Sequence, residues 1–258
     1  MTHPIRIGVQ LQPQHADYAQ IRDAVRRAED LGVDVLFNWD HFFPLSGDPD
    51  GKHFECWTML GAWAEQTSRV QIGALVTCNS YRNPELLADM ARTVDHISGG
   101  RLVLGLGAGF REWEAAEYGY EFGSPAVRVR QLGEALERIG SRLAVLDPPP
   151  TRRIPILVAA DGERALRLVA RHADIWHTFA DGDALSEKSR RLDGYCREIG
   201  RDPAAIERSC FVTGDPWREG PLLLERGVGL MTVITRGPDH DLDELRRWIA
   251  WRDGQDGP

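Results

Sequence analysis

The segment from Gly73 to Gly109 constrains the fold more than any other part of this chain. Residues 70–77 are a short continuous apolar run, which is typical of a strand buried on both faces. Pro84 begins a helix that Ser98-Gly99-Gly100 ends, and residues 102–106 form a second apolar run. Two buried strands joined by a crossover helix predict a right-handed parallel unit.

The same alternation runs through the rest of the chain. Further strands are expected at residues 6–12, 33–39, 156–160, 175–179, 209–212 and 230–234. Helices are expected at residues 17–31, 56–67, 124–146, 163–172, 185–199 and 242–251, with only a short helical piece at 222–226. Eight strand–helix units predict an α/β fold, a single (β/α)8 TIM-type barrel that forms one domain over residues 1–258.

One stretch resembles a domain linker, the run Pro148-Pro149-Pro150. Two ordinary domains are the alternative for a chain of 258 residues. Because the same alternation continues on both sides of the prolines, we interpret them as a stiff connection inside one barrel.

Charge and composition narrow the classes of partner. The net charge of −8 disfavours nucleic acid and an anionic membrane as main partners. No run approaches the ~20 apolar residues of a membrane span, and the first residues do not have the pattern of a signal sequence. The four cysteines are scattered without CxxC spacing, which favours reduced thiols. We therefore expect a cytoplasmic protein with a small-molecule substrate.

Barrels of this type carry their chemistry at the carboxyl ends of the strands. Asp40 and His41 directly follow the second predicted strand and are the candidate catalytic residues. Histidine titrates near neutral pH, and a neighbouring carboxylate can fix its tautomer for proton transfer. The structural alternative is an aspartate that caps the loop and a histidine packed under aromatic rings.

Two other strand ends are rich in small residues. Gly107-Ala108-Gly109 follows the fourth predicted strand, and Ala159-Ala160-Asp161-Gly162 leads into a helix N-terminus, whose free N–H groups favour an anion. Together they favour a large planar cofactor over one small substrate. Trp39, Trp176 and Phe179 are candidates for an aromatic wall, although such residues more often belong to a core.

A metal-dependent hydrolase barrel is the main rival interpretation. Such a site needs at least three protein ligands, usually His and carboxylates. The first strand has no HxH pair, and the fifth to seventh strands offer only Asp161, His177 and Asp215. We therefore expect no metal. Cys78, at the end of the third strand, is expected to be a small buried residue.

Several motifs together resemble a known family. They are Asp40-His41-Phe42-Phe43-Pro44, the segment 77–84, the segment 97–109, Ala173-Asp174-Ile175-Trp176 and the segment 248–253. The chain is similar in these residues to the luciferase-like monooxygenase family, and within it to the actinobacterial branch of F420-dependent oxidoreductases.

This resemblance implies a barrel that binds the deazaflavin F420, or alternatively FMN, and transfers a hydride to or from a small organic substrate. It implies a non-proline cis peptide at Ala74-Leu75 beneath the ring, and Thr77 in contact with the ring or ribityl chain. Trp39 and Trp176 are expected in the cofactor pocket. The small residues from Gly107 and from Ala159 onward would face the cofactor's chain and phosphate. Homodimers are frequent in the family.

The chain also departs from the family pattern. Phe110 stands where F420-dependent sugar-phosphate dehydrogenases carry a glutamate, and Ala159-Ala160 replaces the usual glycines. The connection at residues 147–153 and the seventh unit are short. These departures motivate the alternative of a non-catalytic or degenerate flavin- or F420-binding barrel. Arg82, Arg111 and Arg236 are candidates for holding an acidic tail or substrate.

Overall fold

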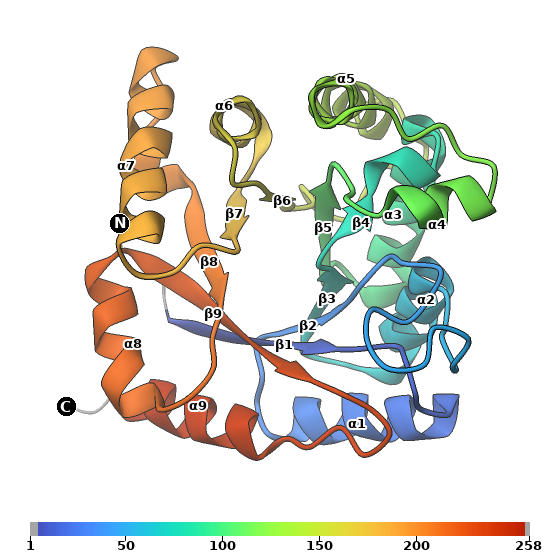
Figure 1. The fold of residues 1–258 in the computed structure, drawn as a ribbon, viewed down its shortest axis with the longest axis vertical. Coiled ribbons are helices and arrows are strands. Elements are labelled where there is room, and N and C mark those ends of the chain that lie inside the picture. The colour runs from blue at the N-terminus through green and yellow to red at the C-terminus, as the bar shows by residue number, and fades with distance from the viewer. Residues whose placement is uncertain (1–4, 256–258) are drawn as a thin grey trace.

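The strands form one closed parallel barrel, seen in a computed structural model that describes residues 5–255 (Figure 1). The order along the sheet is β3-β2-β1-β9-β8-β7-β6-β5-β4, and β3 also pairs with β5, which closes the ring. The strands are β1 (Arg6–Leu11), β2 (Val35–Asn38), β3 (Gln71–Ala74), β4 (Thr77–Cys78), β5 (Leu102–Gly107), β6 (Ile156–Ala159), β7 (Ile175–Thr178), β8 (Glu207–Phe211) and β9 (Val228–Thr235). The predicted barrel is confirmed.

The strand expected at residues 70–77 is split into β3 and β4, which both pair with β5. The nine strands therefore occupy the eight positions of a (β/α)8 barrel. The break contains a cis peptide between Leu75 and Val76, so the expected position at Ala74-Leu75 is wrong by one residue. Ala74 still pairs with Asn38 of β2, and the Leu75 N–H donates to the Asn38 carbonyl at 2.8 Å. The regular ladder thus extends through Leu75 and ends after it.

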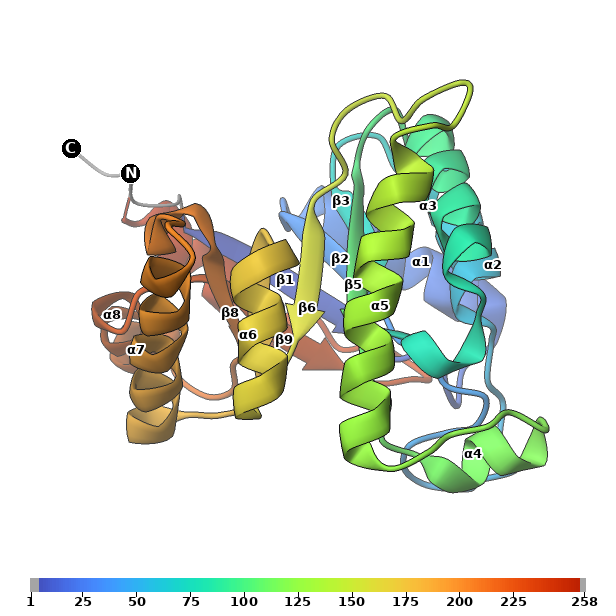
Figure 2. The same ribbon diagram turned by 90° about the horizontal axis from the view of Figure 1, so that it is seen from above.

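Helices cover the outside of the barrel. They are α1 (Tyr18–Asp30), α2 (Cys56–Gln66), α3 (Pro84–Ser98), α4 (Glu112–Glu117), α5 (Pro125–Leu143), α6 (Glu163–His172), α7 (Gly182–Glu198), α8 (Pro216–Glu225) and α9 (Asp243–Asp253). Figure 2 shows α3 and α5 side by side, with α4 beyond the first turn of α5. Gly99 ends α3 in the left-handed conformation, as its sequence predicts. None of the helices among residues 5–255 is long and apolar enough to cross a membrane.

The α8 helix is longer than the short piece expected at residues 222–226. The helix begins before Pro221 and runs through it. Pro216 occupies the first turn, where a missing N–H costs nothing, and Asp215 caps that turn. Gly220 packs so tightly on the ring of Trp251 in α9 that a Cβ there would lie 2.3 Å from it. Tertiary packing therefore overrides the local signal.

The triple-proline connection between α5 and β6 packs on α3. Arg92 donates to the Pro148 carbonyl at 3.0 Å, and the His96 ring lies 2.7 Å from the Pro149 carbonyl oxygen. These contacts fit a stiff connection held against the barrel.

The inside of the barrel is filled by a small apolar cluster, distinct from the larger core between strands and helices. Its buried members are Val35, Phe37, Leu75, Val103, Leu157, Ile175 and Leu230. Because this apolar cluster fills the middle of the barrel, we expect a ligand to bind at the carboxyl ends of the strands.

Glycines allow β3 and β5 to approach each other closely. A Cβ at Gly73 would lie 2.4 Å from the Val103 carbonyl oxygen, and one at Gly105 would lie 2.0 Å from the Ala74 carbonyl oxygen. Neither obstacle is a flexible side chain that could move aside. This approach closes the barrel and requires the absence of a side chain.

Gly105→Ala is therefore expected to destabilise the protein by about 3 kcal/mol or more, at the upper end of overpacking costs. Gly140→Ala is the matched control, since nothing lies within 4 Å of a Cβ at this helical position. It should leave stability unchanged or raise it by up to about 1 kcal/mol. Urea unfolding of both variants measures the difference, and equal midpoints would contradict the close-approach argument.

Candidate active site

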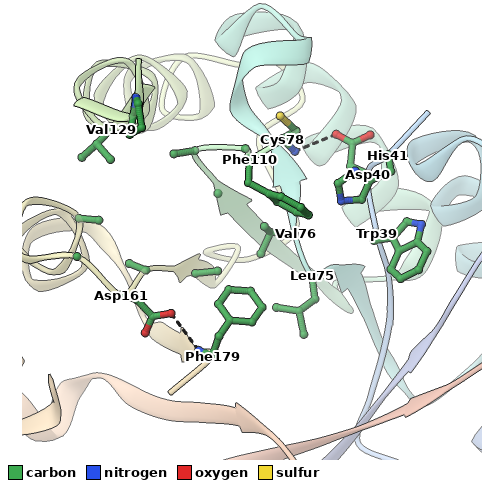
Figure 3. A pocket seen from close by; sticks show the side chains of 18 of the residues that line it. Trp39, Asp40, His41, Leu75, Val76, Cys78, Phe110, Val129, Asp161 and Phe179 are labelled. Carbon is green, nitrogen blue, oxygen red and sulfur yellow. Dashed lines mark hydrogen bonds between the residues drawn. The ribbon is translucent and has the colours of Figure 1, made fainter. Parts of the chain in front are cut away.

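A cavity of about 890 Å³ opens at the carboxyl ends of the strands. Its walls come from the loops after β1, β2, β4, β5, β6 and β7 and from the first turns of α5 and α6 (Figure 3). Of the residues predicted from the sequence, these line it: Trp39, Asp40, His41, Leu75, Gly107, Ala108, Gly109, Ala159, Ala160, Asp161 and Gly162. The structure therefore gathers most of the predicted site around one space.

Three predicted residues, Ala74, Thr77 and Trp176, do not line the cavity. Alternate residues of a strand face opposite sides, and Ala74 and Trp176 belong to the outer core between barrel and helices. Trp176 instead donates its indole N–H to the Ala160 carbonyl at 2.8 Å and so fixes the cavity loop from behind. Thr77 is fully buried, and its hydroxyl has no hydrogen-bond partner in the described part of the chain.

The His41 imidazole is held by a buried carboxylate. Its Nδ1 lies 2.8 Å from Oε2 of Glu114, whose side chain is 0% exposed. The Tyr81 hydroxyl donates to the same oxygen at 3.1 Å, and Arg111 lies 3.6 Å from Oε1. Burial raises the pKa of Glu114, but hydrogen bonding and charge from His41, with the Tyr81 hydroxyl and Arg111, outweigh it, and the pKa is lowered. With Nδ1 engaged by an ionised carboxylate, Nε2 is the ring atom left for chemistry.

Sequence reasoning missed Glu114, because the helix α4 that carries it has only six residues. A segment this short shows no helical periodicity. The sequence signal that could have pointed to Glu114 is the group of aromatic residues around α4. Phe42, next to His41, stacks on Tyr118 with ring centroids 3.9 Å apart. This contact attaches the end of α4 to the loop after β2.

Asp40 is fully occupied by structural contacts. It is 2% exposed, forms a bidentate ion pair with Arg82 and accepts from the Cys78 N–H at 3.0 Å. Burial raises the pKa of Asp40, and the Arg82 charge opposes this effect. Asp40 therefore lines the cavity with both carboxylate oxygens engaged by protein groups. Arg82 also binds Glu55 at 2.9 Å, so its guanidinium is engaged by two carboxylates, and it does not line the cavity.

Trp39 forms the wall beside His41. Its ring meets the His41 ring edge-on at 5.9 Å, and its indole N–H donates to Nε2 of His53 at 3.0 Å. Burial lowers the pKa of His53 to about 4, so this imidazole is neutral at neutral pH and can accept that bond. The contact fixes the plane of the indole.

The opposite end of the cavity suits an anion. Gly162 is the N-cap of α6 and supplies no side-chain hydrogen bond, so the first-turn N–H groups remain available. Asp161 beside it binds Lys188 at 2.9 Å and the Thr178 hydroxyl. Its charge is thereby compensated. Glu163 and Arg164 in the first turn of α6 bring one further charge of each sign to this end of the cavity.

The floor between the two ends is apolar. It is made by Leu75, Val76 and Gly107. A Cβ at Gly107 would lie 2.5 Å from Cγ2 of Val76, so no side chain fits there. An apolar surface beside a helix N-terminus suits a ligand with an apolar body and an anionic tail. Burial raises the pKa of the Cys78 thiol to about 12, which keeps it protonated, as its predicted structural role requires.

His177 lies inside the barrel beneath two phenylalanines. Its ring meets Phe211 and Phe179 edge-on at 4.6 and 5.3 Å, and Nδ1 lies 3.0 Å from the Ser209 hydroxyl. Burial lowers the pKa of His177 to about 3. Among residues 5–255, no group of three or more His, Cys, Asp or Glu side chains is placed to hold a metal ion.

Comparison with known proteins places the chain in context. A sequence model of the family described as luciferase-like monooxygenase matches residues 1–213. The F420-dependent glucose-6-phosphate dehydrogenase of Microbacterium testaceum (strain StLB037) is 30% identical over 96% of this chain and 74% of its own length. The phthiodiolone/phenolphthiodiolone dimycocerosates ketoreductase of Mycobacterium sp. (strain JLS) is 36% identical over 59% of this chain.

The chain spans about half the length of the curated relatives that it first matches, between 45% and 54%. Among solved structures, an F420-dependent secondary alcohol dehydrogenase in complex with an F420-acetone adduct superposes with a TM-score of 0.84. The match covers 98% of this chain and 99% of that one at 19% identity, and so it supports the fold alone.

Burial of neutral His177 predicts a loss of stability in acid. The unfolded histidine binds its proton near pH 6.5, whereas the folded one binds it only near pH 3. Between those values the unfolded state holds the extra proton. The free energy of unfolding should therefore fall with decreasing pH, by about 1.4 kcal/mol per pH unit from this residue alone. In His177→Gln, the free energy of unfolding measured with urea should change less steeply with pH between pH 6 and 4.5 than in the wild type. An equal slope in the two proteins would show that His177 does not cause this pH dependence.

Proposed function

The chain belongs to the luciferase-like monooxygenase family, and we propose that it is an oxidoreductase that transfers a hydride between F420 and a small organic substrate. The observation that carries this proposal is the shape of one cavity. It has an imidazole–carboxylate pair at one end, an apolar floor, and a helix N-terminus without a side-chain cap at the other.

The residues present fit such a cofactor. Leu75, Val76 and Gly107 would hold the ring, and residues 159–162 with the first turn of α6 would hold the phosphate. When bound, the deazaflavin supplies the ring carbon that accepts or donates the hydride. F420 is preferred over FMN because relatives named F420-dependent match this chain, whereas the cavity itself suits either ring.

The proposed role of His41 is proton transfer. A carbonyl that gains a hydride also needs a proton, and an alcohol that loses a hydride must release one. His41 Nε2 can hold that proton, while Glu114 fixes the ring orientation through Nδ1. Positioned acid–base groups of this kind contribute roughly 10²–10⁴-fold to rate. Asp40 acts through the loop after β4 and touches no reacting atom.

We also propose that the described strands and helices form one working domain, in a reducing compartment such as the cytoplasm. The four cysteines are all buried free thiols, which supports that environment. The family resemblance supports a homodimer.

Cofactor binding is the direct test. F420 fluorescence should be quenched saturably by the apo-protein, and Gly107→Ala should weaken binding, because its Cβ would displace Val76 from the floor. Gly140→Ala is the control and should bind like the wild type. Saturable FMN binding with no response to F420 would reverse the choice of cofactor. Binding of neither ring would overturn the proposal, and binding without turnover over a broad substrate panel would favour a non-catalytic barrel.

His41→Asn should lower kcat by roughly 10²–10⁴-fold, with little change in F420 affinity, because it removes proton transfer and leaves the floor intact. Glu114→Gln should lower kcat about tenfold or more, with KM nearly unchanged, because a charged hydrogen-bond acceptor is lost. Glu117→Gln is the matched control, since Glu117 is exposed on the same helix. Wild-type kcat in His41→Asn would remove His41 from the mechanism.

A further inference from the structure

Two phenylalanines on opposite sides of the cavity are unusually exposed. Phe110 is 67% exposed and Phe179 is 63% exposed, and both line the cavity. Figure 3 shows them projecting from different loops into the same space. Large aromatic side chains this exposed within a cavity mark surface that a ligand can cover.

The position of Phe110 connects this surface to the chemistry. Phe110 directly follows Gly107-Ala108-Gly109, and its ring meets the His41 ring edge-on at 5.3 Å. On the other side, Phe179 lies 5.9 Å from Phe211, which also lines the cavity. An apolar group attached to a carbon that reacts beside His41 would therefore meet aromatic surface.

Positive charge is absent from this part of the wall. Of the described residues that line the cavity, only Arg164 is a lysine or arginine, and it lies in the first turn of α6, at the proposed phosphate site. Near His41, Arg111 is engaged by Glu114 and by the Leu45 carbonyl, and Arg82 is engaged by Asp40. A phosphorylated substrate would place a second anion there without a free cation, which is costly in a desolvated site.

We propose that the substrate is an uncharged alcohol or carbonyl compound with an extended apolar group, and that Phe110 and Phe179 determine this specificity. This inference rests on the proposed function and adds the substrate class. In the oxidation, the carbinol carbon loses a hydride to F420, the hydroxyl loses its proton to His41, and the C–O single bond becomes a carbonyl. Reduction of the carbonyl compound by reduced F420 is the reverse.

The dependence of kcat/KM on the chain length of the substrate measures the contribution of the aromatic surface. With F420 present, kcat/KM should rise about fourfold per added methylene from 2-propanol to 2-octanol, the increment expected for burying one methylene. Phe110→Ala and Phe179→Ala should each flatten this increase, and Phe110→Leu should restore part of it. Trp217→Ala is the matched control, because Trp217 is 55% exposed but lies outside the cavity wall.

Direct binding separates this inference from the proposed function. Calorimetry on the oxidised holo-protein should detect 2-octanone, should detect no glucose 6-phosphate, and should show weaker 2-octanone binding in Phe110→Ala. Binding of glucose 6-phosphate in place of 2-octanone would overturn the substrate class, even while F420 binding and reduction stand. A flat chain-length series with active enzyme would overturn it as well. Loss of F420 binding itself would count against the proposed function, and 2-octanone binding to the apo-protein would then still test the apolar surface.

Discussion

The close contact of β3 and β4 with β5 is the constraint on which this molecule depends. Gly73 and Gly105 bring carbonyl oxygens into the space where a Cβ would otherwise stand, and so the ring of strands closes. The same contact places Val76 beside Gly107, and both line the floor of the cavity with Leu75. Closure of the barrel and the shape of the site are therefore set by one pair of strands. A side chain that loosened this contact would disturb both.

Much of this architecture could be predicted from the sequence, because buried parallel strands and amphipathic helices produce strong periodic signals. The strand ends at Asp40-His41 and at Gly107-Ala108-Gly109 gather around one cavity as expected. It was harder to predict which face of a strand each side chain occupies. Ala74 and Trp176 lie in the right strands but point to the outer core, because the pleat of a strand reverses at each residue. Short or tertiary-dependent elements, α4 and the full length of α8, gave too little local signal.

Charge compensation explains why an acidic chain can present a largely neutral cavity. Asp40 is paired with Arg82, Asp161 with Lys188, and Glu114 with His41 and Arg111. Each carboxylate is thus tied to a structural partner before any ligand arrives. The remaining polar groups of the cavity wall include the first turn of α6, with its N–H groups, Glu163 and Arg164, at one end and the His41 imidazole at the other.

The attachment of α4 has a consequence for His41. Glu114 reaches His41 from a surface helix that is joined to the loop after β2 by stacked aromatic rings and does not belong to the strand–helix repeat. Mutations in α4 can change the orientation of the His41 imidazole without altering any strand of the barrel. The orientation of the imidazole is therefore set by a segment that lies outside the strands of the barrel.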